Sequence, residues 1–81
     1  MNLNKSDIKI NVVGKIIQGD QKGWYVLVEN DKNNTGGYYI YQAPIEDILN
    51  SKEGFDDWLE TFEDVKGYFE ESNWQITWLD I

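Results

Sequence analysis

The chain contains no cysteine, no histidine and no arginine. Without cysteine it forms neither a disulfide nor a thiolate zinc site. Without histidine its serines have no imidazole base to take their proton, which removes the commonest route to a serine nucleophile. No apolar run approaches the roughly 18 residues needed to span a bilayer. The 81 residues therefore predict one domain, residues 1–81, that is cytoplasmic and binds no membrane.

Negative charge is concentrated in the second half of the chain. Residues 46–81 hold eleven acidic residues against two lysines, whereas residues 1–45 hold four against five. A field of this sign repels nucleic acid and attracts basic surfaces. We therefore expect a protein that binds a basic protein partner and no nucleic acid.

Alternating apolar and polar residues predict strands. Residues 8–12 alternate in this way, and the run continues through residues 15–17 after a change of apolar phase near Gly14, which indicates a bulge or bend. Residues 23–29 and 38–41 are rich in aromatic and β-branched side chains, and a loop of turn-forming residues joins them, which predicts a hairpin. Residues 74–78 alternate again and predict a C-terminal strand.

A helix is predicted between the hairpin and the last strand. Trp58, Phe62, Val65 and Phe69 lie at i, i+4, i+7 and i+11, which places them on one apolar stripe. The pattern fits one helix, or a short turn followed by a helix that begins at Thr61. The predicted fold class is α+β: a small antiparallel sheet, made of a β-meander plus a C-terminal strand, with one main helix packed on one face.

The aromatic residues divide into an expected core and an ambiguous set. We expect the core to contain Trp58, Phe62, Phe69, Trp74 and Trp78. On a strand, Tyr39 and Tyr41 point to the face opposite Tyr38 and Ile40. Because tyrosine is enriched at interfaces, Tyr39 and Tyr41 are candidates for partner contact, and packing at the sheet edge explains them equally well.

No arrangement of residues predicts catalysis or metal binding. Fifteen acids in 81 residues create carboxylate pairs by chance, so no pair stands out. Residues 31–36 copy the first half of a calcium loop, but the twelfth position is Gln42, where a bidentate glutamate is needed. A hairpin turn explains that segment better. We expect no enzyme, no catalytic residue, no metal and no cofactor.

The acidic residues around the predicted helix are the main candidates for partner binding. Placed on a helix, the acids opposite the apolar stripe are Asp56, Glu60, Glu63 and Glu70, and those along its borders are Asp57, Asp64 and Glu71. Only Lys66 interrupts them, so like charges on this face repel one another and cost stability. We predict that these seven acids meet a basic partner, with Tyr39 or Tyr41 as aromatic anchors.

Five short segments resemble small acidic immunity proteins encoded beside bacterial polymorphic or contact-dependent toxins. The segments are GWYVLVE at 23–29, NTGGY at 34–38, GFDDW at 54–58, YFEES at 68–72 and WQITWL at 74–79. The resemblance covers residues 14–79 and carries no catalytic signature. It implies a cytoplasmic antidote that binds a cognate toxin domain, often a nuclease, and blocks it. Gly36, Gly37, Gly54 and Trp58 have structural roles in this comparison.

The leading interpretation is an immunity protein that neutralises a basic toxin domain through an acidic surface, as a monomer or weak homodimer. Two alternatives remain open. One is a phage- or plasmid-encoded DNA mimic that inhibits a host nuclease, and the other is a protein-interaction module without an inhibitory role.

Overall fold

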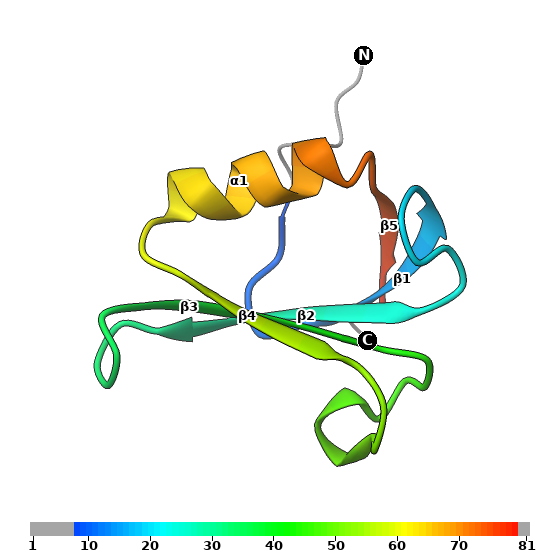
Figure 1. The fold of residues 1–81 in the computed structure, drawn as a ribbon, viewed down its shortest axis with the longest axis horizontal. Helices are drawn as coiled ribbons and strands as arrows, with labels where there is room; N and C mark the ends of the chain where they lie inside the picture. The colour runs from blue at the N-terminus through cyan, green and yellow to red at the C-terminus, as the bar shows by residue number, and fades with distance from the viewer. Residues whose placement is uncertain (1–7, 80–81) are drawn as a thin grey trace.

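Five strands form one antiparallel sheet in the computed structural model, which describes residues 8–79 (Figure 1). The strands are β1 (Val13–Gln18), β2 (Tyr25–Asp31), β3 (Gly37–Ala43), β4 (Phe55–Leu59) and β5 (Gln75–Trp78). They are ordered β4-β3-β2-β1-β5, so β4 and β5 are the two edges. Within residues 8–79 the remaining elements are one helix, α1 (Phe62–Glu71), and one 3-10 turn, η2 (Ile48–Asn50). The predicted α+β class is confirmed.

The two faces of the sheet are covered unequally. Val28 pairs with Ile40, and both are fully buried on the face covered by α1, which we call the helix face. Leu27 and Tyr41 pair on the other face, the open face, where they are half-buried. Figure 1 shows η2 on the side of the sheet opposite α1. The predicted division between Ile40 and Tyr41 on β3 is confirmed.

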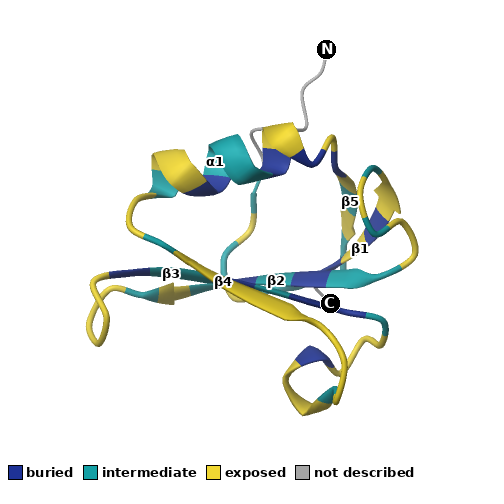
Figure 2. Cartoon of the chain, viewed as in Figure 1, coloured by how far each residue is buried: buried dark blue, intermediate teal, exposed yellow. Residues whose placement is uncertain are grey.

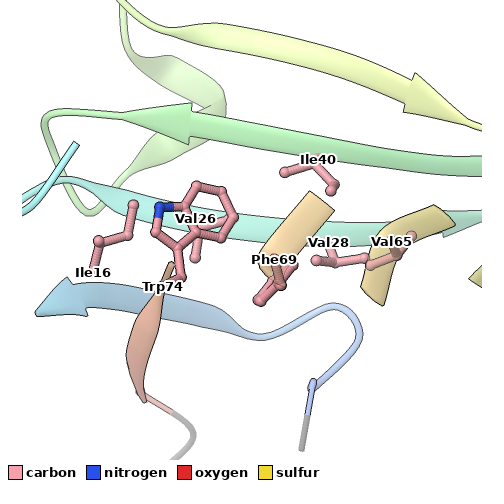
Figure 3. Packing of buried hydrophobic residues seen from close by; sticks show 7 residues of the cluster. All are labelled: Ile16, Val26, Val28, Ile40, Val65, Phe69 and Trp74. Carbon is pink, nitrogen blue, oxygen red and sulfur yellow. The ribbon is translucent and has the colours of Figure 1, made fainter. Parts of the chain in front are cut away.

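The core lies between the helix face and α1 (Figure 3). Its buried cluster consists of Ile16, Val26, Val28, Ile40, Val65, Phe69 and Trp74. Each such side chain contributes about 1.5–3 kcal/mol when removed from water. Phe62 and Trp78 are half-buried and pack against this cluster, so the predicted core aromatics are confirmed except Trp58, which is 43% exposed.

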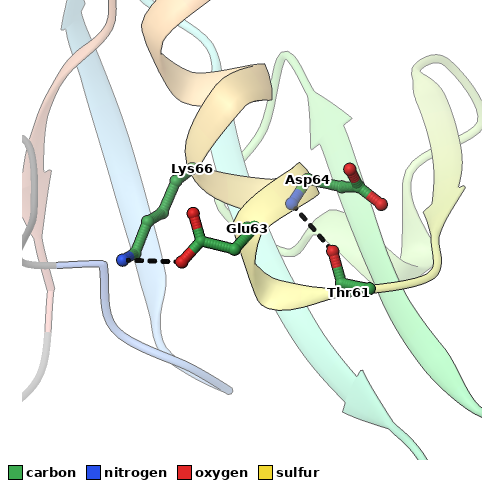
Figure 4. Close-up of polar contacts among 4 residues, drawn as sticks. All are labelled: Thr61, Glu63, Asp64 and Lys66. Atoms are coloured by element: carbon green, nitrogen blue, oxygen red, sulfur yellow. Dashed lines mark hydrogen bonds and ion pairs between the residues drawn. The ribbon is translucent and has the colours of Figure 1, made fainter.

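Both ends of α1 are capped. At the start, the backbone N–H of Asp64 donates to Oγ1 of Thr61 at 3.1 Å (Figure 4), so the predicted start at Thr61 is confirmed. At the end, Asn73 takes a left-handed conformation (φ 56°), and the N–H of Trp74 reaches back to the carbonyl of Phe69 at 3.3 Å. The rings of Phe69 and Trp74 meet edge to face at 4.9 Å. This is a Schellman ending with its hydrophobic contact, and asparagine takes the position that glycine usually holds.

The prediction that the helix extends back to Trp58 is wrong. Trp58 lies in β4, opposite Tyr39 of β3, and the segment before the Thr61 cap is a strand rather than a turn. Gly54 lets the chain enter this strand, since its φ is 144° and a Cβ there would collide with the carbonyl of Gln42. Four of the five β4 residues are exposed. An edge strand with two accessible faces needs no apolar alternation, so the sequence carried no strand signal here.

The predicted first strand begins too early: residues 8–12 lie outside the sheet, whereas residues 15–17 lie in β1 as predicted. Asn11 lies in a turn with φ 63°, and its N–H donates to the carbonyl of Val28 at 2.7 Å. Ile8 and Ile10 are half-buried and still pack against the core. Burial of these two side chains therefore produced the alternation, without sheet pairing. The ladder irregularity falls between Ile16 and Gln18, opposite β5, rather than at Gly14.

Candidate functional site

The outer side of α1 carries exposed carboxylates at both of its ends, in the pairs Glu63–Asp64 and Glu70–Glu71. Successive helical residues are turned by about 100°, so Glu63, Asp64, Glu70 and Glu71 all point away from the buried Val65, and all four are exposed. Glu60, just before the helix, is exposed like these four (Figure 2). We call the set the acidic helix face: Glu60, Glu63, Asp64, Glu70 and Glu71.

One ion pair lies on the acidic helix face. Nζ of Lys66 lies 3.3 Å from Oε2 of Glu63 (Figure 4). This exposed pair spans one turn of α1 (i, i+3). An exposed pair of this kind is worth about 0–1 kcal/mol.

The two pairs of carboxylates differ in their effect on the helix. Glu63 and Asp64 lie in the first turn, where negative charge interacts favourably with the helix dipole. Glu70 and Glu71 lie in the last turn, where the dipole disfavours negative charge and where α1 has no basic residue. Helix stability therefore does not account for Glu70 and Glu71.

Asp56 and Asp57 do not belong to the acidic helix face, contrary to the prediction. Both lie in β4, where neighbouring side chains point to opposite faces. Asp57 is opposite Ile40 and points to the helix face, whereas Asp56 is opposite Tyr41 on the open face. A partner that binds one face of the sheet therefore does not contact both carboxylates from that face.

Tyr39 and Tyr41 form an aromatic patch on the open face together with Trp58. The two tyrosine rings stack with centroids 5.6 Å apart. The Tyr41 hydroxyl donates to Oε1 of Glu29 at 2.8 Å, and burial together with that carboxylate raises the pKa of Tyr41 to about 12. Nε1 of Trp58 donates to Oγ1 of Thr35 at 2.8 Å. The patch is thus held in place by its own polar contacts.

The structure therefore separates the predicted contact residues. The acidic helix face lies on the outer side of α1, which covers the helix face of the sheet. Tyr39, Tyr41 and Asp56 lie on the opposite side of the sheet. The tyrosines and the acidic helix face do not form one continuous surface.

A cleft at the C-terminal end of α1 was not predicted from the sequence. It has a volume of about 310 Å³ and is lined by Asp20, Gln21, Gln42, Phe55, Tyr68 and Ser72. These residues come from four separate parts of the chain, so no local motif marks them. One signal was present: Gln42 follows Tyr38 and Ile40 on the helix face of β3, where an apolar residue is expected.

A polar network connects this cleft to β4. Nε2 of Gln42, which is 5% exposed, donates to the Tyr68 hydroxyl at 2.8 Å. That hydroxyl donates in turn to Oδ2 of Asp57 at 2.5 Å. Burial and the Asp57 carboxylate raise the pKa of Tyr68 to about 12. The network fixes three side chains that meet at the helix, β3 and β4.

The calcium-like segment forms the β2–β3 hairpin loop. Backbone N–H groups of Asn34 and Thr35 both donate to the carbonyl of Asp31, and Gly36 has a φ of 86°. The hairpin turn is confirmed. Over residues 8–79, no cluster of three acidic side chains has the geometry to hold a metal ion, and no helix is long and apolar enough to cross a membrane.

Comparison with protein-family models, with curated proteins and with solved structures gives no match to this chain. Inference about function therefore depends on the surface described above.

Proposed function

We propose that this chain is an immunity-type inhibitor, a cytoplasmic protein that binds and neutralises a basic bacterial toxin domain such as a nuclease. The acidic helix face is the proposed binding surface. The role is binding alone, without catalysis.

The observation that carries the proposal is the presence of exposed carboxylates at both ends of α1, including the last turn, where the helix has no basic residue. Glu70 and Glu71 are unfavourably placed in the helix dipole, so helix stability does not explain their presence. A basic partner offsets this negative charge in the complex. The substrate groove of a nuclease is positively charged because it binds phosphates. Complementary charge accelerates the encounter and selects against other partners.

The test measures association of the purified protein with the purified product of the adjacent gene. Reversing Glu60 and Glu63 to lysine is expected to slow association and to weaken its dependence on salt concentration. The matched control reverses Glu46 and Glu53, which are exposed on either side of η2 in the sequence. This reversal changes the net charge by the same amount. The control pair should keep most of the association rate.

A second charge-reversal variant distinguishes loss of binding from loss of folding. Replacing Glu70 and Glu71 by lysine suits the helix dipole, so α1 is expected to stay folded while binding weakens. Equal effects from the control pair would show that only net charge matters. Unchanged kinetics in both helix variants would remove the acidic helix face from the proposal.

A further inference from the structure

We infer that the cleft at the C-terminal end of α1 binds a guanidinium group, supplied by an arginine side chain of the basic partner. This deepens the proposed function and rests on it for the source of the arginine. The size, the charge, the aromatic wall and the hydrogen-bonding groups of the cleft all suit a guanidinium.

The size of the cleft suits one side chain. Its volume of about 310 Å³ is at the lower end of the roughly 300–1,000 Å³ range of small-molecule sites. Two of its lining residues, Tyr68 and Ser72, lie in the last turn and at the C-cap of α1, and Ser72 directly follows Glu71 of the acidic helix face. A partner guided to that face therefore meets the cleft at its border.

The electrostatics of the cleft favour a cation. Asp20 is exposed at its wall, and none of the lysines that the structure describes lines it. Ser72 is the C-cap of α1, so the negative end of the helix dipole lies at the cleft. Asp57 lies behind Tyr68 and adds a further carboxylate.

Asp20 is held in position by its backbone. Its N–H donates to the carbonyl of Ser72 at 3.0 Å, and its own carbonyl accepts Nε1 of the buried Trp74 at 2.7 Å. A Cβ on Gly19 would collide with the carbonyls of Ser72 and Asn73, so glycine is what lets the turn approach the helix end. The backbone of Asp20 is thus fixed at the wall of the cleft.

An aromatic wall distinguishes guanidinium from ammonium. Phe55 is 53% exposed at the cleft and stacks on Trp24, with centroids 5.7 Å apart and an interplanar angle of 15°. A planar guanidinium stacks face to face on such a ring and donates to a carboxylate in the same plane, whereas an ammonium contacts a ring as a point charge and has no plane to stack.

Gln42 supplies a fixed acceptor. Its amide nitrogen is committed to Tyr68, so its amide oxygen remains to accept, and no donor within residues 8–79 bonds to that oxygen. A guanidinium carries five N–H donors and has partners here in Asp20, Gln42 and the helix end.

The experiment uses the full chain and a small probe, without any toxin. N-acetyl-L-arginine amide is titrated into the ¹⁵N-labelled protein, and N-acetyl-L-citrulline amide, which is neutral and nearly the same shape, serves as the control. We expect saturable amide shifts at Asp20, Gln21, Phe55 and Ser72 with the arginine probe and none with citrulline. Free L-arginine should bind more weakly, because the cleft repels its carboxylate.

An Asp20→Asn variant should weaken binding of the arginine probe about fivefold, the loss of one exposed charge pair. The side chain of Asp20 makes no hydrogen bond with residues 8–79, so the fold is expected to persist, and unchanged amide positions elsewhere check this. Glu46→Gln is the matched control.

Three results would overturn the inference: equal shifts with citrulline, unsaturated shifts spread along Glu60–Asp64, or unchanged affinity in Asp20→Asn. Tighter binding of free L-arginine would instead reject a partner side chain as the source. Because no toxin is present, failure here leaves the acidic helix face to its own test.

Discussion

The hydroxyl of Tyr68 on α1 lies 2.5 Å from Oδ2 of Asp57 on β4 and donates a hydrogen bond to it. Since β4 is an edge strand that pairs only with β3, this bond ties the sheet edge to the helix. The same hydroxyl accepts from the buried Gln42. Asp57 therefore acts within the fold, although the sequence suggested a partner contact.

Removing that hydroxyl should destabilise the protein. Tyr68→Phe leaves the Gln42 amide without its partner, which is expected to lower the free energy of unfolding by about 1–3 kcal/mol. Denaturant unfolding measures the change, and Tyr39→Phe, whose hydroxyl makes no hydrogen bond with residues 8–79, is the control. A double-mutant cycle with Asp57→Asn should show coupling. Additive effects would mean that the bond is absent in solution.

Alkaline pH should test the same network. The pKa of Tyr68 is raised from 10.0 to about 12, so the folded state favours the neutral phenol. The stability from this group is fully present below pH 10 and is lost as the pH rises through 12. In Tyr68→Phe the free energy of unfolding should fall less steeply over this range. In a pH titration followed by phenolate absorbance, Tyr68→Phe should also remove part of the rise at the highest pH. Tyr41→Phe should remove another part of that rise.

Gly67 offers a stabilising substitution in α1. A Cβ at this position meets no atom within 4 Å. Gly67→Ala should raise the free energy of unfolding by about 0.5–1 kcal/mol, because alanine loses less backbone entropy in a helix. Gly14→Ala is the opposing control, since its Cβ would collide with Ile76 and Trp78 and should destabilise. Thermal unfolding of both variants distinguishes these outcomes, and a destabilised Gly67→Ala would contradict the packing seen here.

The aromatic patch should be dispensable for binding through the acidic helix face. Tyr39 lies on the opposite side of the sheet, so Tyr39→Ala is expected to leave the association rate with the basic partner unchanged. The Glu60 and Glu63 reversal measured in parallel should slow it. If Tyr39→Ala instead increases the dissociation rate while the reversal does nothing, the open face is the interface.

Some elements were predictable from local sequence because local physics forms them. The Thr61 cap, the hairpin of β2 and β3 and the last strand each follow from neighbouring residues. The edge strand β4 was not predictable, since its residues are exposed on both faces and their pairing is set by β3. The alternation at Ile8 and Ile10 predicted a strand where none forms, because both side chains are half-buried against the core without pairing in the sheet.

The amino-acid order alone determined the excess of negative charge, the two faces of the central hairpin and the position where the helix starts. These properties depend on composition and on spacing over a few residues. Only the tertiary structure decided that Asp56, Asp57 and the tyrosines are separated from the helix carboxylates, and that Asp20, Gln42, Phe55 and Tyr68 meet in one cleft. Such contacts join residues far apart in the chain, and they depend on which strands become neighbours and where the helix crosses the sheet.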